Sequence, residues 1–232
     1  MMSVNPYLLL VLCLAALVGF VYLVANWRHN VEEKRDRNHW MVSFAKAAKG
    51  VYTAEIRKTG PSGGIDPERG YRSPLAETPA VRAIEFVHRD RETIGADYKT
   101  RVSASANEWK YVPAHSVQVK TKPGVTTYIV PDYRELPDSV MKDLEHVKTF
   151  DREFDDKVLI RAADRDFLAE ILTPELRRWL LDDPRSGKWP IAIEGGYIRT
   201  WSEGYLTRKE LLTEADFLID LVERLPDRFW ER

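Results

Sequence analysis

One uncharged stretch near the start of the chain, from Tyr7 to Ala25, constrains the fold more than any other feature of the sequence. It reads YLLLVLCLAALVGFVYLVA and contains no Asp, Glu, Lys or Arg. An α-helix rises about 1.5 Å per residue and the apolar core of a bilayer is about 30 Å thick, so roughly 20 apolar residues span it. The stretch is apolar on every side of a helix, which is untypical of a core helix. It predicts a transmembrane anchor over residues 1–26.

The residues that flank this stretch predict whether it is cleaved or retained, and how it is oriented in the membrane. Neither Lys nor Arg precedes it and no small-x-small site follows it, so a cleaved signal peptide is disfavoured. Arg28, Lys34, Arg35 and Arg37 follow it, and such residues concentrate on the cytoplasmic side of a membrane helix. We therefore expect a single-pass protein of the cell membrane, with its N-terminus outside and its C-terminal domain in the cytoplasm.

Composition excludes several classes of protein. The formal net charge of -1 gives no basic footprint for nucleic acid. The one cysteine, Cys13, lies inside the apolar stretch, so the rest of the chain offers no disulfide and no thiolate metal site. No motif for a metal, cofactor or catalytic nucleophile is present, and we expect no cofactor and assign no site residues on this basis.

The remaining chain divides by composition into a juxtamembrane segment, residues 27–50, and a larger C-terminal region, residues 51–232. Residues 27–50 carry many charges and then a helical spacing of apolar residues, which predicts a charged juxtamembrane stalk helix. Residues 57–79 are rich in Gly and Pro and predict a long loop. A serine-protease role for Ser62 within this loop is disfavoured, because the only histidines upstream, His29 and His39, lie in the charged stalk. Residues 51–232 are expected to form a soluble α+β domain, with a possible subdivision near residue 150.

Short runs of β-branched and aromatic residues predict an antiparallel sheet. They cover residues 83–87, 98–104, 116–120, 126–130, 157–162, 189–194 and 197–201. Lys122, Pro123 and Gly124 predict a hairpin turn between two of these strands, and Gly195-Gly196 predicts another. The acidic run from Asp151 to Asp156 lacks the glycine of a calcium loop, so we interpret it as a solvated entry to the next strand.

Capping residues and apolar periodicity predict the helices. Asp164 and Thr173 are N-caps of two helices in sequence, the second with Pro174 at its first position. Thr207 and Glu210 form a capping box before a last helix over residues 208–225. A further short helix is expected over residues 139–146.

Several motifs in fixed order resemble a known family. After the apolar stretch come FAKAAKGVY, the paired segments HSVQVKT and TTYIVPDY, then F-D-x-x-F-x-x-K-V, DRDFLAEILTPEL and a last helix that closes in Leu-Pro. This order is similar to an uncharacterised family of actinobacterial membrane-anchored proteins. The resemblance implies a cytoplasmic α+β domain and no activity, because none is assigned to the family.

Two functional hypotheses follow. The first is a non-catalytic, membrane-anchored interaction or scaffold module that contacts the bilayer through residues 7–25 and binds another membrane-associated protein. The second is a membrane-tethered, hydrolase-like enzyme whose site is assembled from distant residues such as His88, His115 and Asp164. The absence of a convergent polar motif favours the first.

Overall fold

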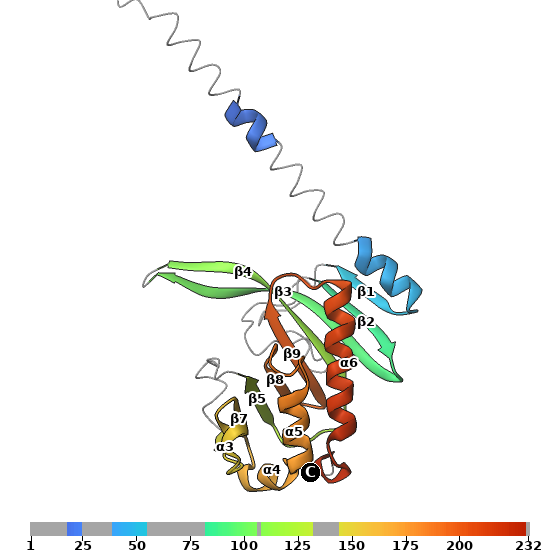
Figure 1. Cartoon of the computed structure of the whole chain (residues 1–232). Helices are drawn as coiled ribbons and strands as arrows, with labels where there is room; N and C mark the ends of the chain where they lie inside the picture. The colour runs from blue at the N-terminus through green and yellow to red at the C-terminus, as the bar shows by residue number, and fades with distance from the viewer. Residues whose placement is uncertain (1–17, 25–38, 55–81, 106–107, 132–143, 231–232) are drawn as a thin grey trace, which may run out of the picture. The chain divides into compact units, whose positions relative to one another are not determined.

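The computed structural model describes residues 18–24, 39–54, 82–105, 108–131 and 144–230 (Figure 1). Residues 18–24 and 39–47 are helical. Most of the predicted anchor, the first part of the stalk and the predicted loop over residues 57–79 lie outside the described residues. Among the helices that are described, none combines the length and the apolar character needed to cross a bilayer.

Among the described residues, nine strands form one sheet in the compact unit that begins at Phe44. Its spatial order is β1-β2-β3-β4-β9-β8-β5-β7-β6, and every neighbouring pair is antiparallel. The strands are β1 (Val51–Ala54), β2 (Arg82–His88), β3 (Arg91–Ser105), β4 (Glu108–Lys120), β5 (Thr127–Pro131), β6 (Glu145–Val147), β7 (Val158–Ala162), β8 (Ile191–Glu194) and β9 (Tyr197–Glu203). The predicted antiparallel sheet is confirmed.

Helices alternate with strands in the C-terminal half of the chain. They are α3 (Arg152–Asp155), α4 (Arg165–Ile171), α5 (Pro174–Asp182), α6 (Arg208–Arg224) and the 3-10 helix η2 (Asp227–Trp230). Three N-caps were predicted correctly, since Asp164, Thr173 and Thr207 each accept a hydrogen bond from the backbone N–H three residues on. The described fold is therefore α+β, as the sequence predicts.

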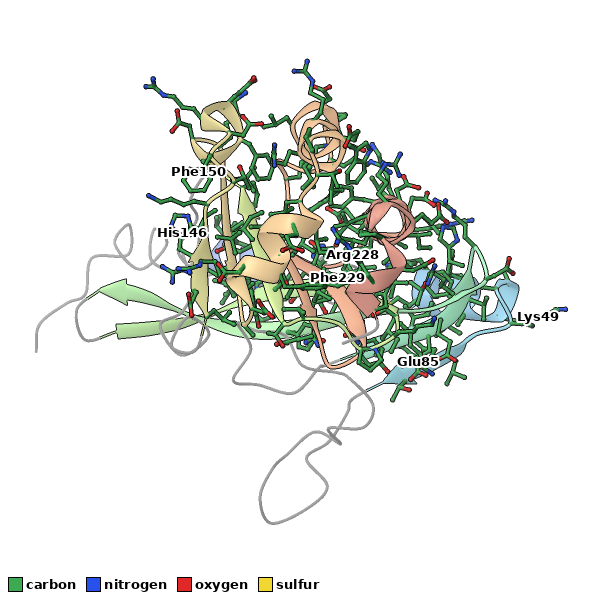
Figure 2. All side chains as sticks on the ribbon, turned by 90° about the horizontal axis from the view of Figure 1, so that it is seen from below. Lys49, Glu85, His146, Phe150, Arg228 and Phe229 are labelled. Atoms are coloured by element: carbon green, nitrogen blue, oxygen red, sulfur yellow. The ribbon has the colours of Figure 1, made fainter. Side chains whose placement is uncertain are left out.

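The helices cover one face of the sheet, which we call the helix face (Figure 2). Gly95 of β3 identifies it, because a Cβ atom there would lie 2.5 Å from Leu211 Cδ1 and 2.7 Å from Leu206 Cδ2. The strand pairing shows which other residues lie on this face, because residues directly opposite one another on neighbouring strands point to the same side of the sheet. The row through Gly95 contains Ile84, Val117, Thr200, Ile191, Ile129 and Ile160. All of these six side chains are buried.

The opposite face of the sheet, the far face, is also buried. Two hydrophobic clusters lie on it, one around Tyr98 and one around Tyr128 and Trp201. The Tyr98 hydroxyl accepts a hydrogen bond from Ser116 at 3.1 Å, and the Tyr128 hydroxyl donates one to Glu194 at 2.9 Å. Burial and the neighbouring carboxylate of Glu194 raise the pKa of Tyr128, so its phenol stays protonated.

Two tight hairpins join neighbouring strands. Gly195 and Gly196, with φ of 59° and 79°, connect β8 to β9 as predicted. Arg89 and Asp90 connect β2 to β3 and also have positive φ values of 48° and 62°. Arg89 is held by α6, because its guanidinium donates to Asp220 at 2.6 Å.

Three local predictions are wrong. Lys122, Pro123 and Gly124 do not form a hairpin turn, because β4 pairs with β3 and β9 whereas β5 pairs with β7 and β8. Residues 145 and 146, expected at the end of a helix, lie in β6, where pairing with β7 outweighs local propensity. The acidic run forms α3 instead of a strand entry, because Asp151 accepts a hydrogen bond from the Phe154 N–H and caps a helical turn.

Candidate functional site

The three residues of the enzyme hypothesis each contact a different partner in the structure. They are His88, His115 and Asp164. His88 Nε2 lies 2.8 Å from Asp216 of α6 at the surface. His115 lies within the sheet, where Glu214 contacts it. The Asp164 carboxylate accepts the Phe167 N–H at 3.0 Å and caps α4. Capping and surface pairing account for two of the three, which leaves His115 as the centre of the candidate site.

His115 links β4 to the first turns of α6. Its Nε2 atom lies 3.0 Å from Glu214 Oε1 and 3.1 Å from Ser202 Oγ. Its Nδ1 atom lies 3.1 Å from the carbonyl oxygen of Gly204. Only 1% of the His115 side chain and none of the Glu214 side chain is exposed. The site is therefore a buried contact between the sheet and α6.

The hydrogen-bond partners decide where the protons lie. A carbonyl oxygen can only accept, so His115 Nδ1 carries a proton and donates it to Gly204. A second proton is shared between His115 Nε2 and the carboxylate of Glu214. Burial by itself lowers the pKa of His115, but the hydrogen bond to Glu214 and its negative charge raise the pKa above its usual value. Burial raises the pKa of Glu214, and His115 partly offsets this. Both pKa directions therefore favour a proton held between the two groups.

This geometry differs from that of a serine hydrolase. Such an enzyme places the serine on one imidazole nitrogen and the orienting acid on the other. Here Ser202 and Glu214 share Nε2, and a backbone carbonyl occupies Nδ1. Because the side chains are also inaccessible to a substrate, the constellation supports the packing of α6 and not acyl transfer.

A second buried ion pair lies beside the first. Arg82 of β2 donates to Asp97 of β3, and the Asp97 carboxylate also accepts the Leu206 N–H at 2.8 Å. Asp97 and His115 are opposite one another in the β3–β4 register. The two pairs therefore hold residues 204–206, the segment that leads into α6, against the sheet. Both are structural contacts, and sequence reasoning did not predict them.

The carboxylates of the acidic run have structural partners too. Asp155 accepts hydrogen bonds from the N–H groups of Thr149 and Phe150, at 3.1 Å each, and from the Thr149 hydroxyl at 2.8 Å. Asp151 caps α3 and pairs with Arg177 at 3.3 Å. Within the part of the chain that the structure describes, no group of three or more His, Cys, Asp or Glu side chains has the arrangement of a metal site.

A pocket opens on the helix side between β5, β7 and the end of α5, with a volume of about 210 Å³. Its apolar lining consists of Ile129, Pro131, Val158, Leu180, Leu181 and Pro184. The polar groups at its edge are already engaged. Asp183 binds the Arg185 guanidinium, and the Ser186 hydroxyl donates to the Asp183 carbonyl oxygen at 2.8 Å. We call it the β5–α5 pocket, and its chemistry suits an apolar group.

The fold and these sites define an α+β protein with structural polar pairs and an apolar surface pocket among its described residues. No protein-family model and no curated protein sequence matches the chain. Among solved structures, the chain is similar to the crystal structure of the mycobacterial trehalose monomycolate transport factor A, TtfA. The similarity has a TM-score of 0.57 at 11% sequence identity and covers 83% of this chain and 97% of that chain. At this identity the similarity shows the fold alone.

Proposed function

We propose that the chain is a membrane-tethered, non-catalytic transport factor that binds another membrane-associated protein from the cytoplasmic side. The fold similarity over nearly the whole of TtfA is the observation that carries the proposal. TtfA comes from a mycobacterium, and mycobacteria are actinobacteria, which is compatible with the family that the motifs resemble. The name of that protein refers to the transport of trehalose monomycolate, and we propose a cargo of that kind for this chain.

The polar residues support a binding module over an enzyme. Four buried polar side chains are already engaged in contacts that position α6. They are His115, Glu214, Asp97 and Arg82. Buried groups that are engaged in this way stabilise a fold, and a group with almost no exposed surface cannot reach a substrate. A module that acts by binding needs only an ordered surface held near its partner.

The tether is supported by the sequence and by the exposure of its described part. Residues 18–24 are helical, and Val18, Phe20 and Tyr22 expose 68%, 65% and 71% of their surfaces. Exposed apolar side chains on several sides of a short helix are unfavourable in water and favourable in lipid. A tether also raises the local concentration of the domain around a membrane partner.

Affinity capture of the full-length chain from native membranes tests the proposal. We expect an integral membrane protein to be enriched in a fixed ratio to the chain. As a control, an unrelated apolar helix of equal length replaces residues 7–25, and we expect this chain to keep the partner because the tether only locates the domain. Deletion of residues 7–25 should remove the partner. Recovery of the chain alone from intact membranes would contradict the proposal.

A further inference from the structure

Arg161 of β7 is a half-buried arginine that has no carboxylate partner among the described residues. Its Nη1 group donates to the Leu144 carbonyl oxygen at 3.2 Å, whereas its Nε–H is buried and has no hydrogen-bond partner. Four other buried or half-buried arginines each pair with a carboxylate. They are Arg82, Arg177, Arg185 and Arg199. Because a guanidinium has five N–H donors and keeps its charge, Arg161 retains both donors and charge for an anion.

Two further nitrogen-bearing side chains lie beside Arg161. Arg161 is opposite Tyr128 of the far face, and His146 of β6 is opposite Arg161, so both point to the far face. Lys148 follows two residues after His146 and is exposed. β6 is the last strand of the sheet, and Figure 2 shows His146 at the rim of the molecule. We call Arg161, His146 and Lys148 the edge cluster.

The surroundings of His146 favour its neutral form. Burial lowers the pKa of His146, and the positive charges of Arg161 and Lys148 lower it further. The Asp155 carboxylate acts in the opposite direction, but it is already engaged with two backbone N–H groups. The edge cluster therefore combines two fixed positive charges with an imidazole that gains a proton when an anion is close.

The edge cluster suits a phosphate monoester better than a carboxylate. Two parallel N–H groups of an arginine match two oxygens of one tetrahedral anion, and a lysine adds a mobile point charge. A phosphate monoester is close to a dianion at neutral pH, so it balances both fixed charges, whereas a carboxylate balances one. The partly buried side chains of Leu144 and Leu159 pack on the same face and reduce the exposure of the site to water.

We propose that the edge cluster binds the phosphate group of a monoester through Arg161 and Lys148, with His146 as a third donor. The bound anion supplies the counter-charge that the half-buried guanidinium lacks. Such a group is carried by phosphatidate in a membrane and by soluble phosphorylated molecules. The inference stands independently of the transport function proposed above.

Inorganic phosphate tests the site without an added lipid. The full-length chain is held in dodecyl maltoside micelles and labelled with ¹³C-histidine, and His146→Gln assigns the His146 resonance. Phosphate is titrated against NaCl so that ionic strength stays constant. We expect the His146 resonance to shift to saturation while the other histidine resonances stay in place. A response no larger than that to NaCl alone would overturn the proposal.

Two lipids distinguish the sources of the phosphate group. Phosphatidate carries a monoester and phosphatidylglycerol carries a diester with a single charge, and each is added to the micelles in equal amount. Saturation by phosphatidate far below the concentration needed with inorganic phosphate would support a lipid headgroup as the ligand. Equal affinity for phosphatidate and inorganic phosphate would support the phosphate group of a soluble molecule. Equal shifts with the two lipids would overturn recognition of a monoester.

Three variants separate the edge cluster from overall charge. Lys148→Gln removes an exposed cation and should raise the Kd for phosphate about tenfold, since a charged hydrogen bond is lost. Arg161→Lys keeps the charge but loses the planar pair of donors, so it should weaken binding while Tm stays close to that of the wild type. Lys122→Gln, at an exposed site outside the sheet, is the matched control and should leave Kd unchanged. Equal losses in Lys148→Gln and Lys122→Gln would contradict a specific site.

The pH dependence of sulfate binding tests the part played by His146. Sulfate is a tetrahedral dianion that does not titrate near neutral pH, so any change in affinity comes from the protein. A bound anion raises the pKa of His146, so affinity should increase as pH falls through the bound-state pKa and level off below the free-state pKa. His146→Gln should remove this increase. The same pH profile in the wild type and the variant would show that His146 does not face the anion.

Discussion

At the residue scale, the most informative position is Glu214, an acid on the apolar side of α6. It lies three residues after Leu211 and four before Leu218, and all three are fully buried. That spacing is a sequence signal for a buried carboxylate. Its partner could not be predicted, because His115 lies 99 residues away and only the folded sheet brings the two together.

The His115–Glu214 pair predicts how stability depends on pH. Both pKa values are higher in the folded chain than in the unfolded one, so the folded chain holds the extra proton. The His115 contribution is complete below the unfolded pKa of histidine, about 6.5, and the Glu214 contribution is complete below that of glutamate, about 4.3. Each contribution is lost as pH rises through the folded pKa of its group. We expect the free energy of unfolding to fall from pH 6 towards pH 9.

Glu214→Gln is the matched variant for this prediction. Its amide can still donate to His115 Nε2 and fills the same space, but it does not titrate. Chemical denaturation at several pH values should show a smaller loss of stability above pH 6.5 in the variant than in the wild type. Equal slopes for the two proteins would mean that the pair does not hold the proton.

At the element scale, local signals succeeded where caps and periodicity agree. Asp164, Thr173 and Thr207 each begin the helix that the sequence predicts, and Gly195-Gly196 makes its hairpin. The failures are short elements. β6 is a strand only because β7 lies beside it, and that pairing leaves no local signature. α3 does have a local signal, because Asp151 caps it as Asp164 caps α4, but the charged run around it was interpreted as a strand entry.

Thr207→Ala tests the capping box of α6. The Thr207 hydroxyl accepts the Glu210 N–H at 3.2 Å, and Glu210 in return accepts the Thr207 N–H at 2.9 Å. Loss of the first bond should cost about 1 kcal/mol and lower Tm by roughly 2–4 °C. Lys122→Ala, an exposed change outside any helix, is a suitable control. A melting curve identical to that of the wild type would argue that α6 begins at another residue.

At the scale of the whole molecule, the sequence predicts the class of fold but not its topology. The antiparallel pairing was expected, whereas the position of β9 between β4 and β8 was not. Strand order depends on which buried faces fit together in three dimensions. The alternation of apolar and polar residues along a single strand does not determine that order. The pocket between β5, β7 and α5 depends on that strand order, so it could not be predicted from the sequence either.

A chain that begins near Asn38 tests whether the anchor contributes to the core. The compact unit from Phe44 onward has its own buried residues on both faces of the sheet. We therefore expect the shortened chain to remain soluble without detergent and to unfold in one cooperative transition. Aggregation, or gradual melting without a transition, would indicate that the membrane helix or a second protein completes the fold.

The tether and its orientation are the part of the proposed function on which the rest depends. The most direct measurement is a pair of reporters fused after Arg232, one fluorescent only in the cytoplasm and one active only outside the membrane. We predict a bright fluorescent fusion in the membrane fraction and an inactive external reporter, because Lys and Arg follow the apolar stretch and none precede it. A dark fluorescent fusion together with an active external reporter would contradict the proposed topology and, with it, a cytoplasmic binding module.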